Sequence, residues 1–185
     1  MTLHIVALQA CPPQPWRNGG GLTRELLAWP AAEGWQLRIS VARIDRSGPF
    51  SPFPGMQRCF TVLHGAGVTL DLPNGPTTLT PADEPLAFDG EAAPMCHLLD
   101  GPTEDLNLMA TRDAGRAFMQ RATTGSRLDG PTRWRGLYAA ERVLLDIGDR
   151  TEAIAAGSLA WSDDTDNSAW RLHEGGRGWW LVLEN

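Results

Sequence analysis

Residues 35–44, Trp-Gln-Leu-Arg-Ile-Ser-Val-Ala-Arg-Ile, alternate between apolar side chains and polar or small ones, which predicts a β-strand. Every second residue from Trp35 to Val41 is apolar, so one face of this strand suits a core. Shorter apolar runs recur along the chain, separated by 14 prolines and 20 glycines. Because such punctuation leaves little room for long helices, the sequence predicts an all-β protein.

Two parts of the chain resemble each other. Residues 68–90 contain Val-Thr-Leu-Asp-Leu, a turn and then Leu-Ala-Phe-Asp-Gly, and residues 143–163 contain Val-Leu-Leu-Asp-Ile, a turn and then Leu-Ala-Trp-Ser-Asp. The repeat predicts a duplicated β-sandwich or barrel unit. We expect the units to be residues 1–112 and 113–185 and to share an interface.

One segment fits two structures. Leu22, Leu26 and Trp29 have helical spacing, which would predict an amphipathic helix. The same residues could form an extended strand that ends at Pro30. The sequence leaves both structures open.

The composition excludes several functions. The 185-residue chain has a formal net charge of −6, so we expect neither nucleic acid nor a membrane as a partner. All 16 basic residues are arginine, which excludes lysine Schiff bases and lysine-linked pyridoxal phosphate. The N-terminus does not read as a signal peptide, and the three cysteines lie far apart, which fits free thiols in a reducing cytoplasm.

The sequence shows no local metal motif. No two of the four histidines lie within ligand spacing of each other, and there is no Cys-x-x-Cys pair. A metal site could still form if the fold brought His64 and His97 together near Glu91 or Asp105. We expect that the protein holds no metal.

The most varied polar stretch is residues 15–25, Pro-Trp-Arg-Asn-Gly-Gly-Gly-Leu-Thr-Arg-Glu. Three glycines let the backbone adopt positive φ or pass close to another group. A tight turn beside a solvated strand needs fewer polar groups than surround these glycines, so we favour a site for a small polar ligand. The candidate ligand-binding residues here are Trp16, Arg17, Asn18, Gly19, Gly20, Gly21, Thr23, Arg24 and Glu25.

Two further stretches supply candidates. Residues 48–55, Gly-Pro-Phe-Ser-Pro-Phe-Pro-Gly, form a rigid apolar loop that fits either the cap of a barrel or the rim of a pocket. Residues 105–109 alternate, so Asp105, Asn107 and Met109 share a face that lines a cavity or faces solvent. The candidates outside residues 15–25 are Ser40, Phe53, Arg58, Asp105 and Asn107.

These stretches together resemble the HutD/Ves family. The resemblance covers residues 1 to about 112, and the triple glycine and the Gly-Pro-Phe-Ser motif are its most specific parts. The matching segments are residues 15–25, 37–42 and 48–55 with Arg58, then 88–90, 100–102 and 105–109 with Arg112. The resemblance implies a bicupin, with two cupin-like (RmlC-type) double-stranded β-helix barrels and few helices. The His-x-His motif that binds metal in many cupins is not present, so we expect no cofactor.

HutD proteins are associated with bacterial histidine utilisation, where a regulatory role has been proposed. The resemblance therefore implies a cytoplasmic protein that binds a small carboxylate, such as urocanate, formiminoglutamate or formylglutamate. Guanidinium groups bind carboxylates through paired hydrogen bonds. The roles we assign are carboxylate binding for Arg17, Arg24 and Arg58, orientation for Asn18, Thr23 and Asn107, and closure for Trp16 and Phe53.

Two other functions stay open. A metal-free isomerase or hydrolase acting on the same ligands would use Glu25 as its general base, and it would show a buried carboxylate of raised pKa facing the cavity. A protein-interaction module would present residues 50–53 as an exposed apolar patch. The sequence also leaves open whether the protein is a homodimer.

Overall fold

The computed structural model describes residues 2–164 and 168–185. Within them the chain forms β-strands joined by loops and three short 3-10 helices. Residues 11–114 make one compact unit, and residues 2–10 with 115–185, apart from the gap, make the other. The fold is therefore all-β, as the alternating and punctuated sequence predicts. No helix in this part of the chain is long and apolar enough to cross a membrane.

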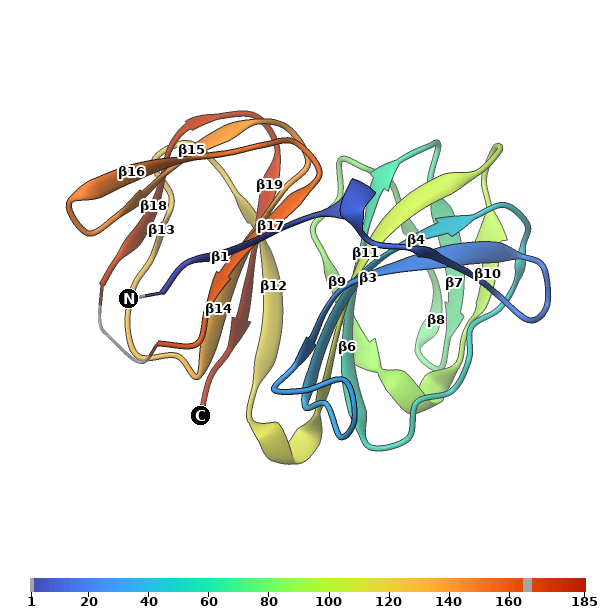
Figure 1. Ribbon diagram of the computed structural model, residues 1–185. Helices are drawn as coiled ribbons and strands as arrows, with labels where there is room; N and C mark the ends of the chain where they lie inside the picture. Colours follow the sequence, from blue (N-terminus) through green and yellow to red (C-terminus); the bar gives the residue numbers. More distant parts are fainter. Residues whose placement is uncertain (1, 165–167) are drawn as a thin grey trace. The chain divides into compact units, whose positions relative to one another are not determined.

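The unit of residues 11–114 consists of two antiparallel sheets (Figure 1). One has six strands in the order β2-β3-β4-β11-β6-β9, and the other has four in the order β5-β10-β7-β8. Apolar side chains such as Phe60, Val68 and Leu70 pack together as its core. The elements are β2 (Pro13–Pro15), β3 (Gly21–Trp29), β4 (Leu37–Ile44), β5 (Gly48–Pro49), β6 (Met56–His64), β7 (Val68–Leu72), β8 (Gly75–Leu79), β9 (Leu86–Asp89), η2 (Gly90–Ala92), β10 (Met95–Leu98), β11 (Thr103–Thr111) and η3 (Arg112–Ala114).

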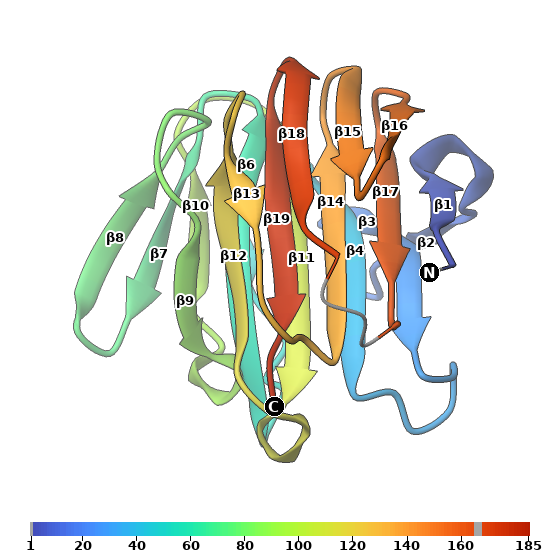
Figure 2. The ribbon, with the colours of Figure 1, turned by 90° about the vertical axis from the view of Figure 1, so that its left-hand side faces the viewer.

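The other unit also has two antiparallel sheets, which Figure 2 shows with their strands side by side. Their orders are β1-β17-β14-β19-β12 and β13-β18-β15-β16. Its core contains the fully buried rings of Trp170 and Trp180. The elements are β1 (His4–Ala7), η1 (Leu8–Ala10), β12 (Ala117–Ala122), β13 (Arg127–Leu128), β14 (Trp134–Ala139), β15 (Val143–Ile147), β16 (Arg150–Ile154), β17 (Ser158–Ser162), β18 (Trp170–Gly175) and β19 (Gly178–Leu183).

The strand orders confirm the internal repeat. The order β5-β10-β7-β8 recurs as β13-β18-β15-β16, and β4-β11-β6-β9 recurs as β12-β19-β14-β17, so eight consecutive strands are used twice in one topology. The matching sequences Val68–Leu72 and Val143–Ile147 form equivalent strands, β7 and β15. This is the cupin-like jelly roll, present twice. In the described residues of each unit the two sheets remain separate and are not closed into one barrel.

The ambiguous segment is a strand, β3, and a β-bulge explains its helical spacing. The pairing of β3 with β4 shifts register between Glu25 and Leu27, so an extra residue interrupts the alternation. Leu22 pairs with Arg43 and Trp29 with Leu37, which lie on one face of β4, so Leu22 and Trp29 share a face although they differ in parity along β3. The three cysteines are buried and are not joined by disulfides, as expected.

The expected boundary near residue 112 and the shared interface stay predictions. Residues 113–185 alone should show no cooperative melt, because about 70 residues rarely build a sufficient core and because β1, which pairs with β17, would be missing. Circular dichroism of that fragment tests this expectation. A sharp thermal transition would show that residues 113–185 fold independently, without β1 or residues 11–112.

Candidate functional site

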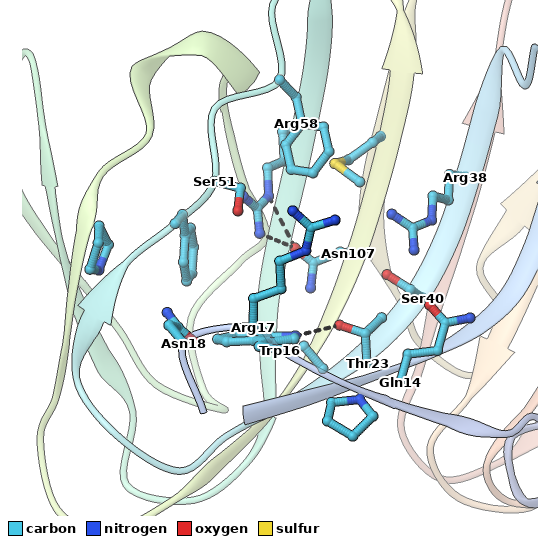
Figure 3. Close-up of a pocket in the computed structure, with 16 residues that line it drawn as sticks. Gln14, Trp16, Arg17, Asn18, Thr23, Arg38, Ser40, Ser51, Arg58 and Asn107 are labelled. Carbon is cyan, nitrogen blue, oxygen red and sulfur yellow. Dashed lines mark hydrogen bonds between the residues drawn. The ribbon is translucent and has the colours of Figure 1, made fainter. Parts of the chain in front are cut away.

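A cavity of about 490 Å³ lies within the unit of residues 11–114 (Figure 3). Its walls come from the segment around β2, from one face of strands β3, β4, β6 and β11, and from the loop after β5. Three arginines point into this space, and no acidic side chain of residues 2–164 and 168–185 lines it. The lining residues are Gln14, Pro15, Trp16, Arg17, Asn18, Thr23, Arg38, Ser40, Ala42, Pro49, Phe50, Ser51, Phe53, Arg58, Asn107 and Met109.

Strand alternation brings the polar lining residues together. Asn107 of β11 lies opposite Ser40 of β4, and Met109 lies opposite Arg38. Because side chains two residues apart on a strand share a face, these four project from the same side of the sheet. Farther along the same side of the sheet, Ile44 and Phe60 belong to the apolar core. The cavity therefore lies where polar side chains replace apolar ones on this face.

The three glycines of the triple-glycine segment have different surroundings, and two of them, Gly19 and Gly21, occupy positions that favour glycine. Gly19 is the one with positive φ, +67°, and its N–H donates to the carbonyl oxygen of Trp16 at 3.0 Å. The Gly20 N–H donates to Oδ1 of Asn18 at 2.9 Å. A Cβ on Gly21 would lie 2.2 Å from the carbonyl oxygen of Arg43. The segment is thus a tight turn that enters β3, and the turn carries lining residues on its first half.

The first half of this turn places an aromatic ring and a cation at the cavity. Nε1 of Trp16 donates to Oγ1 of Thr23 at 2.8 Å, which fixes the indole ring against β3 (Figure 3). Arg17 follows at an exposed position and reaches into the cavity. Trp16 also lines a smaller neighbouring cavity of about 230 Å³, together with Gly20.

Arg58 is the buried cation of the site. Its Nε and Nη2 donate to Oδ1 of Asn107 at 3.1 and 2.7 Å, and its guanidinium carbon lies 4.3 Å from the ring centre of Phe50. Burial lowers the pKa of Arg58 to about 10, which still leaves the group charged at neutral pH. A guanidinium that is held by an amide and an aromatic ring retains N–H groups for an anion.

Arg38 supplies a second oriented cation. Its Nε donates to Oε2 of Glu25 at 2.6 Å, and both side chains are partly buried. Glu25 itself is outside the lining, and it holds the guanidinium of Arg38 while Arg38 lines the cavity. Glu25 therefore orients an arginine.

Asp105 is fully buried on the same face of β11 as Asn107. Its Oδ2 accepts a hydrogen bond from Oγ1 of Thr103 at 2.8 Å, and its Oδ1 has no hydrogen-bond partner. Burial raises the pKa of Asp105 to about 7, although the Thr103 hydrogen bond and the charge of Arg58 oppose the shift. Asp105 is not part of the cavity wall.

The structure brings together eight of the expected site residues and separates six. Those that line the cavity are Trp16, Arg17, Asn18, Thr23, Ser40, Phe53, Arg58 and Asn107. Arg24 turns away and donates to the carbonyl oxygen of Cys11. The other five outside the wall are Gly19, Gly20, Gly21, Glu25 and Asp105.

Sequence reasoning missed several lining residues. Arg38 and Ala42 could have been found, because each lies two residues from Ser40 and therefore shares its face of the strand that residues 35–44 predict. Pro49, Phe50 and Ser51 belong to the apolar loop that was considered as a pocket rim. Pro15 begins the stretch of residues 15–25 but was not named as a candidate, and Gln14 lies just before that stretch.

The interaction-module alternative lacks the surface it requires. Phe50 is buried and Phe53 is half-buried, so residues 50–53 do not present the exposed apolar patch of an interaction module.

The histidine that the sequence left open as a metal ligand has another partner. His97 pairs with Asp71 at 2.9 Å on the surface. Across residues 2–164 and 168–185, no three His, Cys, Asp or Glu side chains gather as a metal site would require.

The equivalent positions of the second unit are filled. Thr103 and Gly178 open the equivalent strands β11 and β19, so Asp105 corresponds to Trp180 and Asn107 to Val182. Both of these residues are fully buried in the core cluster of that unit. Where one jelly roll has a carboxyl and an amide, its repeat has a large ring and an aliphatic side chain.

These features define a duplicated cupin-like jelly roll with an arginine-lined cavity in its N-terminal repeat. The HutD family matches residues 8–180, and the chain belongs to this family. An uncharacterized 21.2 kDa protein in the hutC 3′ region of Pseudomonas putida is 38% identical over 141 residues, which cover 75% of this chain and 74% of that protein. Protein Ves of Citrobacter koseri is 36% identical over 127 residues, covering 65% of this chain and 66% of the relative.

Solved structures show the same fold. A conserved protein of unknown function from Pseudomonas aeruginosa PAO1 is similar with a TM-score of 0.89, 26% identity and full coverage of both chains. HutD from Pseudomonas fluorescens SBW25 is similar with a TM-score of 0.85 and 26% identity, covering 99% of this chain and 98% of that one. A bacterial pirin from Escherichia coli, solved in complex with nickel(II), has a TM-score of 0.66 at 10% identity over 99% of each chain, which concerns the fold alone.

Proposed function

We propose that this protein binds a small carboxylate in the cavity of its N-terminal repeat and acts as a regulatory component of histidine utilisation. The observation that supports binding is the charge of the lining: Arg17, Arg38 and Arg58 face one cavity, and the described part of the chain places no acidic side chain in its wall. Such a cavity attracts anions, and guanidinium groups suit carboxylates because they donate two parallel hydrogen bonds.

The size and the remaining lining suit a small polar molecule. A volume of about 490 Å³ falls in the range of small-ligand sites. The indole of Trp16 and the ring of Phe53 offer flat apolar surface, while Ser40 and Asn107 offer hydrogen-bonding groups. Urocanate, formiminoglutamate and formylglutamate each combine a carboxylate with a planar polar group, so all three match this combination.

Family membership supports the pathway. The chain belongs to the HutD family, and the Pseudomonas putida relative is described by its position in the hutC 3′ region. A cytoplasmic location and regulation of the pathway are parts of the proposal that rest on this relationship. A homodimer remains compatible with it.

An enzyme acting on the same ligands is the second candidate. Glu25, its expected general base, is bound to Arg38 outside the cavity wall. Asp105 has the burial and raised pKa of a catalytic carboxyl but also lies outside the wall. Incubation with each of the three compounds, followed by mass spectrometry, separates turnover from binding.

Isothermal titration calorimetry with the three compounds tests the proposed site. Arg17→Met and Arg38→Met should each weaken binding about 10-fold to 150-fold, since a lost charged hydrogen bond costs roughly 1.5–3 kcal/mol. Arg43→Met is the matched control, because Arg43 is on the same strand as Arg38 but is exposed and bound to Asp45.

Thermal melting confirms that each variant is folded. Equal affinity of the wild type and both variants would remove the cavity as the binding site. If the wild type binds none of the three compounds, the proposed ligand class is wrong.

A further inference from the structure

We propose that Asp105 controls the charge balance of the cavity, so that an anion binding at Arg58 is coupled to uptake of one proton from solvent by Asp105. This inference rests on the proposed function, because it assumes that a carboxylate occupies the cavity. It gives Asp105 a role as a positioning residue that acts through Arg58, and not as a ligand contact.

The first observation is the position of the two groups. Arg58 of β6 lies beside Met109, yet its side chain extends along β11 to Asn107. Asp105 is the next residue on that face of β11, and Nδ2 of Asn107 contacts the Asp105 carbonyl oxygen at 3.4 Å. Arg58 and Asp105 are both buried, and each affects the ionisation of the other.

The second observation is the small number of other charges. The groups that act on the pKa of Asp105 are Thr103 and Glu104 on β11 and Arg58 on β6, and Asp105 in turn raises the pKa of the Cys96 thiol on β10. Opposite Asp105, β4 contributes Ala42 and β6 contributes Val62. Val62 belongs to the same buried apolar cluster as Val68 and Leu70 of β7. Burial raises the pKa of the Cys96 thiol to about 12, so this thiol stays neutral. Arg58 is the cation that acts on the pKa of Asp105.

The coupling follows from electrostatics. An ionised Asp105 offsets the buried charge of Arg58 when the cavity holds no anion. A carboxylate arriving at Arg58 adds a second negative charge to the same cation, and two carboxylates at one site raise the pKa of one of them. Asp105 is the one that takes the proton, because its Oδ1 has no hydrogen-bond partner and protonation there breaks no existing bond.

The consequence is a preference for low pH. Above the pKa of unliganded Asp105, each unit of pH should weaken anion binding up to about tenfold, because one proton must be taken up per ligand. Below that pKa the proton is already present and affinity should be constant. N-Formyl-L-glutamate is the suitable probe, since neither of its carboxylates titrates between about pH 6 and about pH 8.5.

Calorimetry at several pH values, in paired buffers of different ionisation enthalpy, measures both affinity and proton uptake for the wild type. We expect up to about one proton per bound N-formyl-L-glutamate near pH 8, and a Kd that rises with pH. Asp105→Asn, which keeps an acceptor for Thr103, should bind without proton uptake and with a Kd independent of pH. Glu104→Gln, its neighbour on β11, should retain the proton uptake and a pH-dependent Kd, with the onset of that dependence at slightly lower pH because the charge of Glu104 raises the pKa of Asp105.

The possible outcomes separate this inference from the proposed function. Binding of the probe with no proton uptake, or an Asp105→Asn variant that retains the pH dependence, would overturn the role of Asp105 and leave the site intact. Failure of the wild type to bind the probe at any pH would overturn both. The proton-uptake measurement uses the wild type, so it holds even if Asp105→Asn does not fold.

Discussion

Gly21→Ala should destabilise the protein more than any other single methyl addition in the triple-glycine segment. Its Cβ would lie 2.2 Å from the carbonyl oxygen of Arg43, and Gly21 pairs with Ile44 at the start of the β3–β4 ladder. Relief requires the two strands to separate, because the obstructing atom belongs to the backbone. We expect a loss of about 3 kcal/mol or more, which lowers the melting temperature by about 6–12 °C.

The neighbouring glycines are matched controls. Gly19→Ala meets no atom within 4 Å but must keep a φ of +67°, so it should cost about 1–2 kcal/mol. Gly20→Ala approaches only the Asn18 side chain, at 3.2 Å, and this side chain can move. Thermal melts followed by circular dichroism should therefore rank Gly21→Ala as the most severe. Equal melting temperatures for the three variants would show that β3 does not approach β4 so closely.

The second large effect is the pH dependence of stability that Asp105 imposes. Its pKa is about 7 in the folded protein against an ordinary value of 3.8, so the unfolded chain releases this proton more readily. Folding is then favoured by Asp105 at low pH, and the advantage is lost as pH rises from about 4 through about 7. A difference of about three pKa units corresponds to about 4 kcal/mol.

Asp105→Asn removes this titration while keeping the shape of the side chain. Relative to the wild type, the variant should gain up to about 4 kcal/mol of unfolding free energy between about pH 4 and about pH 8. Urea denaturation at several pH values measures this difference, and the comparison cancels groups that both proteins share, such as Asp89 and Asp146. A difference that does not change with pH would mean that the carboxyl is ionised in the fold without penalty.

The limits of sequence reasoning are clear at two residues. Alternation correctly placed Asp105 and Asn107 on one face, because side-chain direction in a strand is a local property. Alternation did not reveal that Asn107 lines the cavity while Asp105 is buried outside its wall. Whether a side chain on that face reaches the cavity depends on which residues of other strands, Arg58 among them, pack over it. Alternation also puts Arg38 on the face of Ser40, but it does not reveal that Glu25 holds the Arg38 guanidinium, because the two become neighbours only when β3 pairs with β4.

The sequence by itself determined the all-β fold, the duplication and the membership of the HutD family. Those depend on strand periodicity, turn residues and motifs that are local in the chain. Only the tertiary structure decided where the cavity lies. The two repeats share one topology, yet Asn107 and Asp105 of the first correspond to Val182 and Trp180 of the second. Whether a strand face encloses a polar cavity or a packed core depends on the volume and charge of side chains from several strands, which meet only after folding.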